Sequence, residues 1–222
     1  MNRMVRHDMA RSTYMVDVHE DPSSAGALRF TFVPTNSRQA PSARAPQPGR
    51  QYILLVRGDA NEMEFDWIKP PGDDATRKEL EAIARQRVTM RQEWLLKVQK
   101  LVATVKRWAD ELGWATRVVD KKMEDAEIGN YTAPALLLQQ ESIRLFLEPV
   151  ARSAPGAEGL VDLYLMPSYD DIASLYYYDN RWNVHYRFED APVVGNIREA
   201  EARPLTKATL RSVVDDMKAH AG

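Results

Sequence analysis

The sequence predicts an α+β fold, an antiparallel sheet of five or six strands with one long helix packed across it. Three observations lead to this prediction: short alternating apolar runs before residue 72, a helical period over about 76–112, and more short apolar runs after it. Strands, a long helix, strands and a last helix in this order are typical of α+β architecture. We expect residues 1–72 to form a strand-rich sub-domain and residues 73–222 the main domain.

The N-terminal part reads as four strands. Apolar side chains alternate with polar ones, or run continuously, over Thr13–Val18, Leu28–Val33, Tyr52–Val56 and Glu62–Ile68. Between the second and third runs, residues 34–50 hold four prolines and no aliphatic residue larger than alanine. Such a stretch cannot bury enough apolar surface to offset its ordering entropy, so we expect a flexible loop.

The long helix has clear end signals. Thr76 with Glu79 fits a capping box, and Gly113 stands where a left-handed C-cap belongs. Apolar residues recur at helical spacing from Trp94 to Leu112 and predict one buried stripe. Arg87 and Arg91 interrupt this stripe: they either face acidic groups of a partner or lay their stems along the core edge.

The strands expected after this helix are Trp114–Val119, Ala135–Gln140, Ile143–Val150, Leu160–Met166, Ile172–Tyr178 and Trp182–Phe188. The last two form a hairpin, because Asp179-Asn180 suits a type I′ turn. A helix over Leu205–His220 is expected to close the core.

The register of that hairpin defines two faces. Pairing Tyr177 with Trp182 and Leu175 with Val184 gives an apolar core face. The other face carries the candidate binding surface Tyr176, Tyr178, Arg181 and His185, to which we add the helix residues Arg87 and Arg91. Clustered Tyr, Arg and His are typical of interface hot spots and also stack on single-stranded bases. The alternative is that other elements cover this face and bury the rings.

Composition excludes several classes of protein. The chain has no cysteine, so it forms no disulfide and no thiolate metal site. It has no apolar run of about 18 residues, and Met1–Ala10 has no apolar core, so we expect no membrane span and no secretory signal. These features lead us to expect a cytoplasmic location.

Motifs for familiar chemistry are missing. The sequence contains no GxxxxGK[ST], GxGxxG, GxSxG or HExxH, and its four histidines lie far apart. Glu148 or Asp162 could supply carboxylates to a metal-dependent nuclease, but no lysine lies between Lys122 and Lys207 to orient an attacking water. We therefore expect no catalytic residues, no metal ligands and no cofactor, and we identify no small-molecule ligand.

The formal net charge of −2 conceals charged blocks. Eight arginines against four acids give residues 1–57 a charge of +4, and residues 58–75 carry −5, 76–107 carry +6 and 108–175 carry −7. The basic blocks could bind nucleic acid, or the blocks could neutralise each other within the fold or across a subunit contact.

These observations give one functional expectation and one alternative. We expect a non-catalytic intracellular protein–protein interaction module that acts in an oligomer or multiprotein assembly, through the tyrosine face and through a helix with two tryptophans, Trp94 and Trp108. The alternative is a nucleic-acid-binding protein, including a metal-dependent nuclease.

Overall fold

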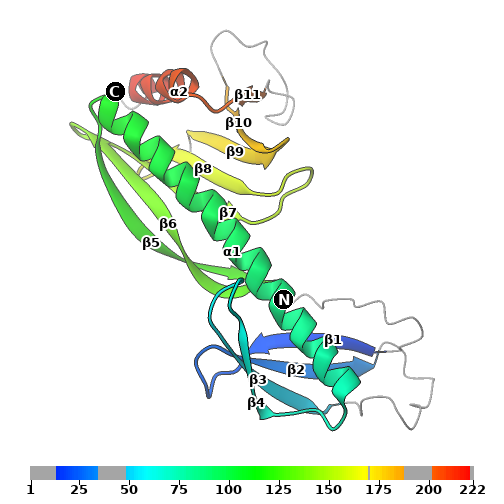
Figure 1. Ribbon diagram of the computed structural model, residues 1–222. Helices are drawn as coiled ribbons and strands as arrows, with labels where there is room; N and C mark the ends of the chain where they lie inside the picture. Colours follow the sequence, from blue (N-terminus) through cyan, green and yellow to red (C-terminus); the bar gives the residue numbers. More distant parts are fainter. Residues whose placement is uncertain (1–13, 35–48, 170, 188–201, 221–222) are drawn as a thin grey trace. The chain divides into compact units, whose positions relative to one another are not determined.

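The computed structural model describes residues 14–34, 49–169, 171–187 and 202–220 (Figure 1). Its fold is α+β, as predicted, with a long helix and a C-terminal helix. The strands form two separate antiparallel sheets of four and seven strands, so the predicted size of five or six strands is wrong. The proline-rich segment predicted as a flexible loop lies almost wholly outside the described residues, as does Phe188.

The chain divides into two compact units. The first unit runs to Glu93 and includes Glu124–Tyr131, and the second unit comprises Trp94–Met123 and the chain from Thr132 onward. The strands predicted before residue 72 lie in the first unit, which also takes in the first half of the long helix and the tip of a later hairpin. Helix α1 (Asp74–Glu111) is continuous and contributes to both units.

The sheet of the first unit has its strands in chain order. They are β1 (Tyr14–Glu20), β2 (Ala27–Pro34), β3 (Gln51–Arg57) and β4 (Glu64–Lys69). Alternate side chains of these strands, among them Phe30 and Leu54, pack against Leu80 and Ile83 of α1 in one apolar core. Burial of this face against the helix is what the alternation in the sequence encodes.

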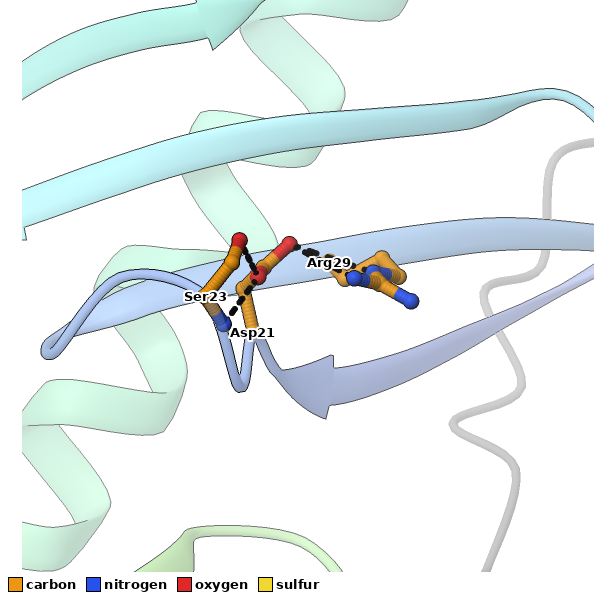
Figure 2. Close-up of polar contacts among 3 residues, drawn as sticks. All are labelled: Asp21, Ser23 and Arg29. Carbon is orange, nitrogen blue, oxygen red and sulfur yellow. Dashed lines mark hydrogen bonds and ion pairs between the residues drawn. The ribbon is translucent and has the colours of Figure 1, made fainter.

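Asp21 holds the turn between β1 and β2 together (Figure 2). Its Oδ1 accepts hydrogen bonds from the backbone N–H and the hydroxyl of Ser23. Its Oδ2 accepts hydrogen bonds from Nε and Nη2 of Arg29 at 3.1 and 3.0 Å. These hydrogen bonds, those from Ser23 first, lower the pKa of Asp21 because they favour its charged form. A buried carboxylate is tolerated here because both of its oxygens have partners.

The long helix begins earlier than predicted. Asp73, not Thr76, is its N-cap: Oδ1 of Asp73 accepts the N–H of Thr76 at 2.8 Å, and the Asp73 carbonyl accepts the N–H of Arg77. At the other end Gly113 has φ +82°. The N–H groups of Gly113 and Trp114 bond back to Asp110 and Ala109 as in a Schellman motif, which confirms the predicted C-cap.

The sheet of the second unit has seven strands, β5 to β11, each beside its neighbour in the chain. They are β5 (Ala115–Asp125), β6 (Gly129–Gln140), β7 (Ile143–Ala151), β8 (Leu160–Leu165), β9 (Ile172–Tyr178), β10 (Arg181–His185) and β11 (Ala202–Pro204), followed by α2 (Lys207–His220). This arrangement is an antiparallel meander, in which each strand is hydrogen-bonded to its neighbours in the chain (Figure 1).

One face of this sheet carries both helices. Trp94 of α1 packs against Trp182 of β10, and Lys97 lies over the ring of Tyr177. Helix α2 contacts the same face, since the hydroxyl of Tyr186 donates to Asp216 at 2.7 Å, and Lys207 of α2 pairs with Glu111 of α1. The opposite face is called the open face below.

The register predicted for the β9–β10 hairpin is confirmed. Tyr177 pairs with Trp182 and Leu175 with Val184, and Asp179 and Asn180 have φ +51° and +58°, as a type I′ turn requires. Asn183 is buried beside this turn and donates to the carbonyls of Tyr178 and Arg181.

Trp94 does not offer the helix surface that the sequence suggested. It is 1% exposed and belongs to the core of the second unit, and a Cβ on Gly159 would lie 2.6 Å from its ring. The Trp94 ring therefore packs inside the unit, since only glycine at position 159 lets the backbone come this close.

Among the helices that the structure describes, none is long and apolar enough to cross a membrane.

A pair of substitutions on one helix tests this packing. Trp94→Ala should lower the free energy of unfolding by about 3–5 kcal/mol, because it leaves a large cavity between α1, Gly159 and Trp182. Leu96→Ala, at a side chain that is 48% exposed, should change it by less than about 0.5 kcal/mol. Urea denaturation of the full chain measures both, and equal effects would contradict the placement of Trp94.

Candidate binding surface

A row of polar side chains crosses the open face at one level of the sheet. Glu148 of β7 pairs with Asp162 of β8, Asp162 with Ser174 of β9, and Ser174 with His185 of β10. Directly paired residues of an antiparallel sheet point to the same face. Strand register therefore brings together four residues that span 38 positions of the sequence, from 148 to 185.

Asp162 is the centre of a satisfied hydrogen-bond network. It is 5% exposed, its Oδ1 accepts the hydroxyl of Ser174 at 2.8 Å, and its Oδ2 accepts the hydroxyl of Tyr169 in a short hydrogen bond. Although Tyr169 is 52% exposed, burial of its hydroxyl end and the bond to Asp162 raise the pKa of Tyr169. Glu148 has its own partner, Lys121, at 3.0 Å. These carboxylates are committed to groups of the same chain.

Beside this row lies a cavity of about 410 Å³. It is lined by residues of β9, β10 and the turn before β8, namely Ser174, Tyr176, Tyr178, His185, Pro155, Gly156 and Ala157. The ring of His185 meets Tyr176 edge-on at 4.9 Å between centroids and Tyr178 at 6.4 Å. Three aromatic rings thus form one wall of the cavity.

A tight turn forms the other wall. The N–H of Ala157 bonds to the carbonyl of Ala154 at 2.9 Å, and Gly156 has φ +77°. Proline followed by a left-handed glycine is the signature of a type II turn. The segment after this turn is fixed to β9, because Glu158 donates to the Tyr177 carbonyl and Tyr177 donates to that of Gly159.

His185 is an uncharged aromatic wall at neutral pH. Its Nε2 is buried without a hydrogen-bond partner. Burial lowers the pKa of His185, because an imidazolium in this position would lose hydration without gaining a carboxylate partner. The cavity consequently presents three aromatic rings, of which the imidazole carries no charge at neutral pH.

The arrangement does not activate a nucleophile. The hydroxyl of Ser174 donates its hydrogen bond to Asp162 rather than to His185, so the serine–histidine hydrogen bond of an acyl-transfer site is not formed. Within the described ranges, no three His, Asp or Glu side chains gather closely enough to hold a metal ion.

The predicted binding residues fall into two groups. Tyr176, Tyr178 and His185 line the cavity together, while Arg181 is exposed at the end of the hairpin, opposite Tyr178. Arg87 belongs to the first unit, whereas the cavity residues belong to the second. Arg91, also of the first unit, is half-buried.

Arg87 is enclosed by groups of its own unit. It is 6% exposed, and its Nη1 donates to the carbonyl of Glu127 at 2.9 Å. Burial lowers the pKa of Arg87, and the carboxylate of Glu20 opposes this shift. Arg87 thus uses its charge within the chain, where it lines a polar cavity of about 460 Å³.

Gly129 makes this enclosure possible. It has φ +79°, and a Cβ there would lie 2.3 Å from Nη2 of Arg87 and 2.9 Å from Oε1 of Glu20. Glu20 also accepts the backbone and side-chain amides of Asn130 at 3.1 and 3.2 Å. The start of β6 is thereby tied to the end of β1 and to α1 within the first unit.

No protein-family model, no curated protein and no solved structure matches this chain. Its function is therefore inferred below from the geometry of its own residues.

Several residues of the surface escape prediction from sequence. The sequence places Ser174 on the tyrosine face, but it does not reveal the bonds from Ser174 and Tyr169 to Asp162 or the wall made by Pro155 and Gly156. One feature of the sequence could have predicted the network around Asp162. This residue lies between apolar residues in a buried strand, where a carboxylate needs hydrogen-bond partners.

The state of His185 is testable through pH. Its folded pKa lies below that of an unfolded histidine, near 6.5, so its neutral form is present in both states above about pH 7. As pH falls below 6.5 the unfolded chain binds the proton first, so the folded state loses stability until the folded pKa is passed. His185→Phe keeps a ring and should remove this loss.

The test compares the denaturation midpoints of wild type and His185→Phe between about pH 7.5 and pH 5, a range around the ordinary histidine pKa of about 6.5. The difference between the two profiles gives the contribution of His185 to the loss of stability. Tyr178→Phe keeps His185 and should retain the wild-type dependence. Parallel profiles of wild type and His185→Phe would contradict the buried, uncharged ring.

Two glycine substitutions test the enclosure of Arg87. Gly129→Ala should destabilise the chain by about 2–4 kcal/mol, through left-handed strain and the clash with Arg87. Gly49→Ala is the matched control, because Gly49 has φ +78° and, among the residues that the structure describes, no atom lies within 4 Å of the added Cβ. It should cost only about 1–2 kcal/mol. Equal losses in chemical denaturation would mean that the packing around Arg87 is loose.

Proposed function

We propose that this chain is a non-catalytic intracellular binding module that recognises a partner protein through the cavity on its open face. One observation carries the proposal: Tyr176, Tyr178 and His185 line a cavity of about 410 Å³ while remaining only half-buried. Tyrosine rings fixed on a strand offer large contact area at low entropic cost, which is why they recur at interface hot spots. The lack of cysteine supports the intracellular part of this proposal.

The chemistry of the cavity favours an apolar or aromatic anchor residue of the partner. Its aromatic rings, with Pro155 and Ala157, provide apolar contact, and His185 brings no charge at neutral pH. The volume is at the small end of ligand sites, which suits one or two inserted side chains. Arg181 at the rim can add a charged contact that selects among partners.

Nucleic acid is the alternative occupant. Two tyrosines on one face of a strand, with Arg181 close by, could stack successive bases. Against this, the carboxylates of Glu148 and Asp162 lie on the same face, and the nearest ring that could become cationic, His185, is neutral. Phosphate recognition needs the opposite balance of charge.

Peptides selected from a random display library against the full chain test the proposal. Selected peptides should share an apolar or aromatic residue, and Tyr176→Ala or Tyr178→Ala should weaken their binding about 30-fold, as expected for loss of a hot spot worth about 2 kcal/mol. The control Ile68→Ala removes an apolar side chain that is 53% exposed on β4 and should leave the affinity unchanged.

Binding that survives both tyrosine substitutions, or a selection that enriches no common residue, would refute the proposed site. A gel-shift series with single-stranded oligonucleotides at about 50 mM salt separates the alternative, because phosphate contacts are strongest at low salt. Retardation that Tyr176→Ala abolishes would replace the protein partner by nucleic acid.

A further inference from the structure

Strand β5 leaves a long edge of the seven-stranded sheet unpaired. It has 11 residues and stands at the end of the strand order, and in the part of the chain that the structure describes no strand pairs with its outer side (Figure 1). A free edge presents a row of backbone donors and acceptors to any other strand. The opposite edge, β11, has only three residues and ends in Pro204, so it offers no such row.

We propose that two copies of this chain pair through β5, antiparallel about a two-fold axis at Lys121, so that the sheet continues from one copy into the other. This surface is separate from the cavity of Tyr176 and Tyr178, and its occupant is a second copy of the chain.

Symmetry restricts the possible registers. If a two-fold axis relates two antiparallel edge strands of one continuous sheet, that axis is perpendicular to the sheet. Each face of the sheet in one copy then continues into the same face of the second copy. Facing residues must then share a face. Burial alternates strictly from Val118 to Asp125, so residues on one face are separated by even numbers of positions. The axis therefore passes through a residue and not between two residues.

Charge and the length of overlap then select one residue for the axis. An axis at Met123 pairs Lys122 with Glu124 of the second copy, but it overlaps only residues 121–125 of each β5, whereas an axis at Lys121 overlaps residues 117–125. An axis at Asp120 sets the two Asp120 carboxylates against each other, and an axis at Lys122 sets Asp120 against Glu124. An axis at Lys121 instead places Asp120 opposite Lys122 of the second copy, twice, and both side chains are exposed in the chain described here. Opposite charges on facing residues stabilise a strand pair, and like charges destabilise it.

The apolar side chains agree with the same axis. With Lys121 at the centre, Val119 lies opposite Met123 of the second copy, again twice. Both are half-buried, so they lie on the more enclosed face of the strand, where apolar contact across the pair excludes further water.

The central lysine pair does not oppose this arrangement. Nζ of Lys121 is held by Glu148 at 3.0 Å and by the carbonyl of Pro149 at 3.0 Å. Each copy thus neutralises its own Lys121. Edge lysines commonly prevent strand pairing, but here Lys122 has a matching acid in the second copy.

Sedimentation velocity of the full chain over a range of concentrations tests the inference. Wild type should show a monomer–dimer equilibrium. Asp120→Lys and Lys122→Asp each convert two attractive pairs into repulsive ones and should weaken dimerisation about tenfold or more. The doubly substituted chain D120K/K122D should dimerise again, and an equimolar mixture of the two single variants should form the heterodimer.

Asp215→Lys, an equal charge change at an exposed residue of α2, is the control and should leave dimerisation unchanged. Wild type that stays monomeric at every concentration would overturn the inference. So would single variants that dimerise like wild type, or a mixture of them that fails to recover, because only this register pairs residue 120 with residue 122. None of these results depends on the tyrosine cavity.

Discussion

The contact of Trp94 with Gly159 and Trp182 determines the organisation of the second unit. A helix tryptophan can lie this close to the backbone only because residue 159 has no side chain, and the approach fixes α1 over the β9–β10 hairpin. The same segment, through Gly159 and Glu158, is bonded to Tyr177. It holds the Pro155-Gly156 turn in place, so the packing on the helix side positions a wall of the cavity on the open side.

Several charged groups of the described residues pair within the chain. Lysines of the basic helix pair with acids from distant segments, as Lys97 does with Glu158, and Arg87 is enclosed beside Glu20 in the first unit. Basic and acidic blocks that look like opposed surfaces in the sequence thus meet partly inside the fold. This reduces the positive surface left for phosphates and favours a protein partner for the open face.

The two proposed surfaces use different parts of one sheet. The cavity employs side chains at the β9–β10 end, where rings are exposed and charges are satisfied, and β5 employs backbone groups at the other end. A dimer through β5 would present two cavities at once, and two linked sites raise the apparent affinity for a partner that carries two binding segments.

Local signals in the sequence determined the helix period, the Gly113 C-cap and the type I′ turn at Asp179-Asn180, because each depends on residues within one or two turns of chain. The hairpin turn also fixed the register, and with it the shared face of Tyr176, Tyr178 and His185. Asp73 is the N-cap in place of Thr76, because its carboxylate accepts the N–H of Thr76 and caps the helix three residues earlier.

Only the tertiary structure decided that the strands before and after α1 form separate sheets of four and seven strands, because local periodicity predicts single strands but not which of them share a sheet. It alone showed that Arg87 faces Glu20 and Glu127 of the same chain rather than water, and that Asp162 binds Ser174 and Tyr169. A charged residue in an apolar stripe has the same sequence signature whether its partner is solvent, another protein or a carboxylate far along the chain. Its surroundings become defined only when the distant strands pack.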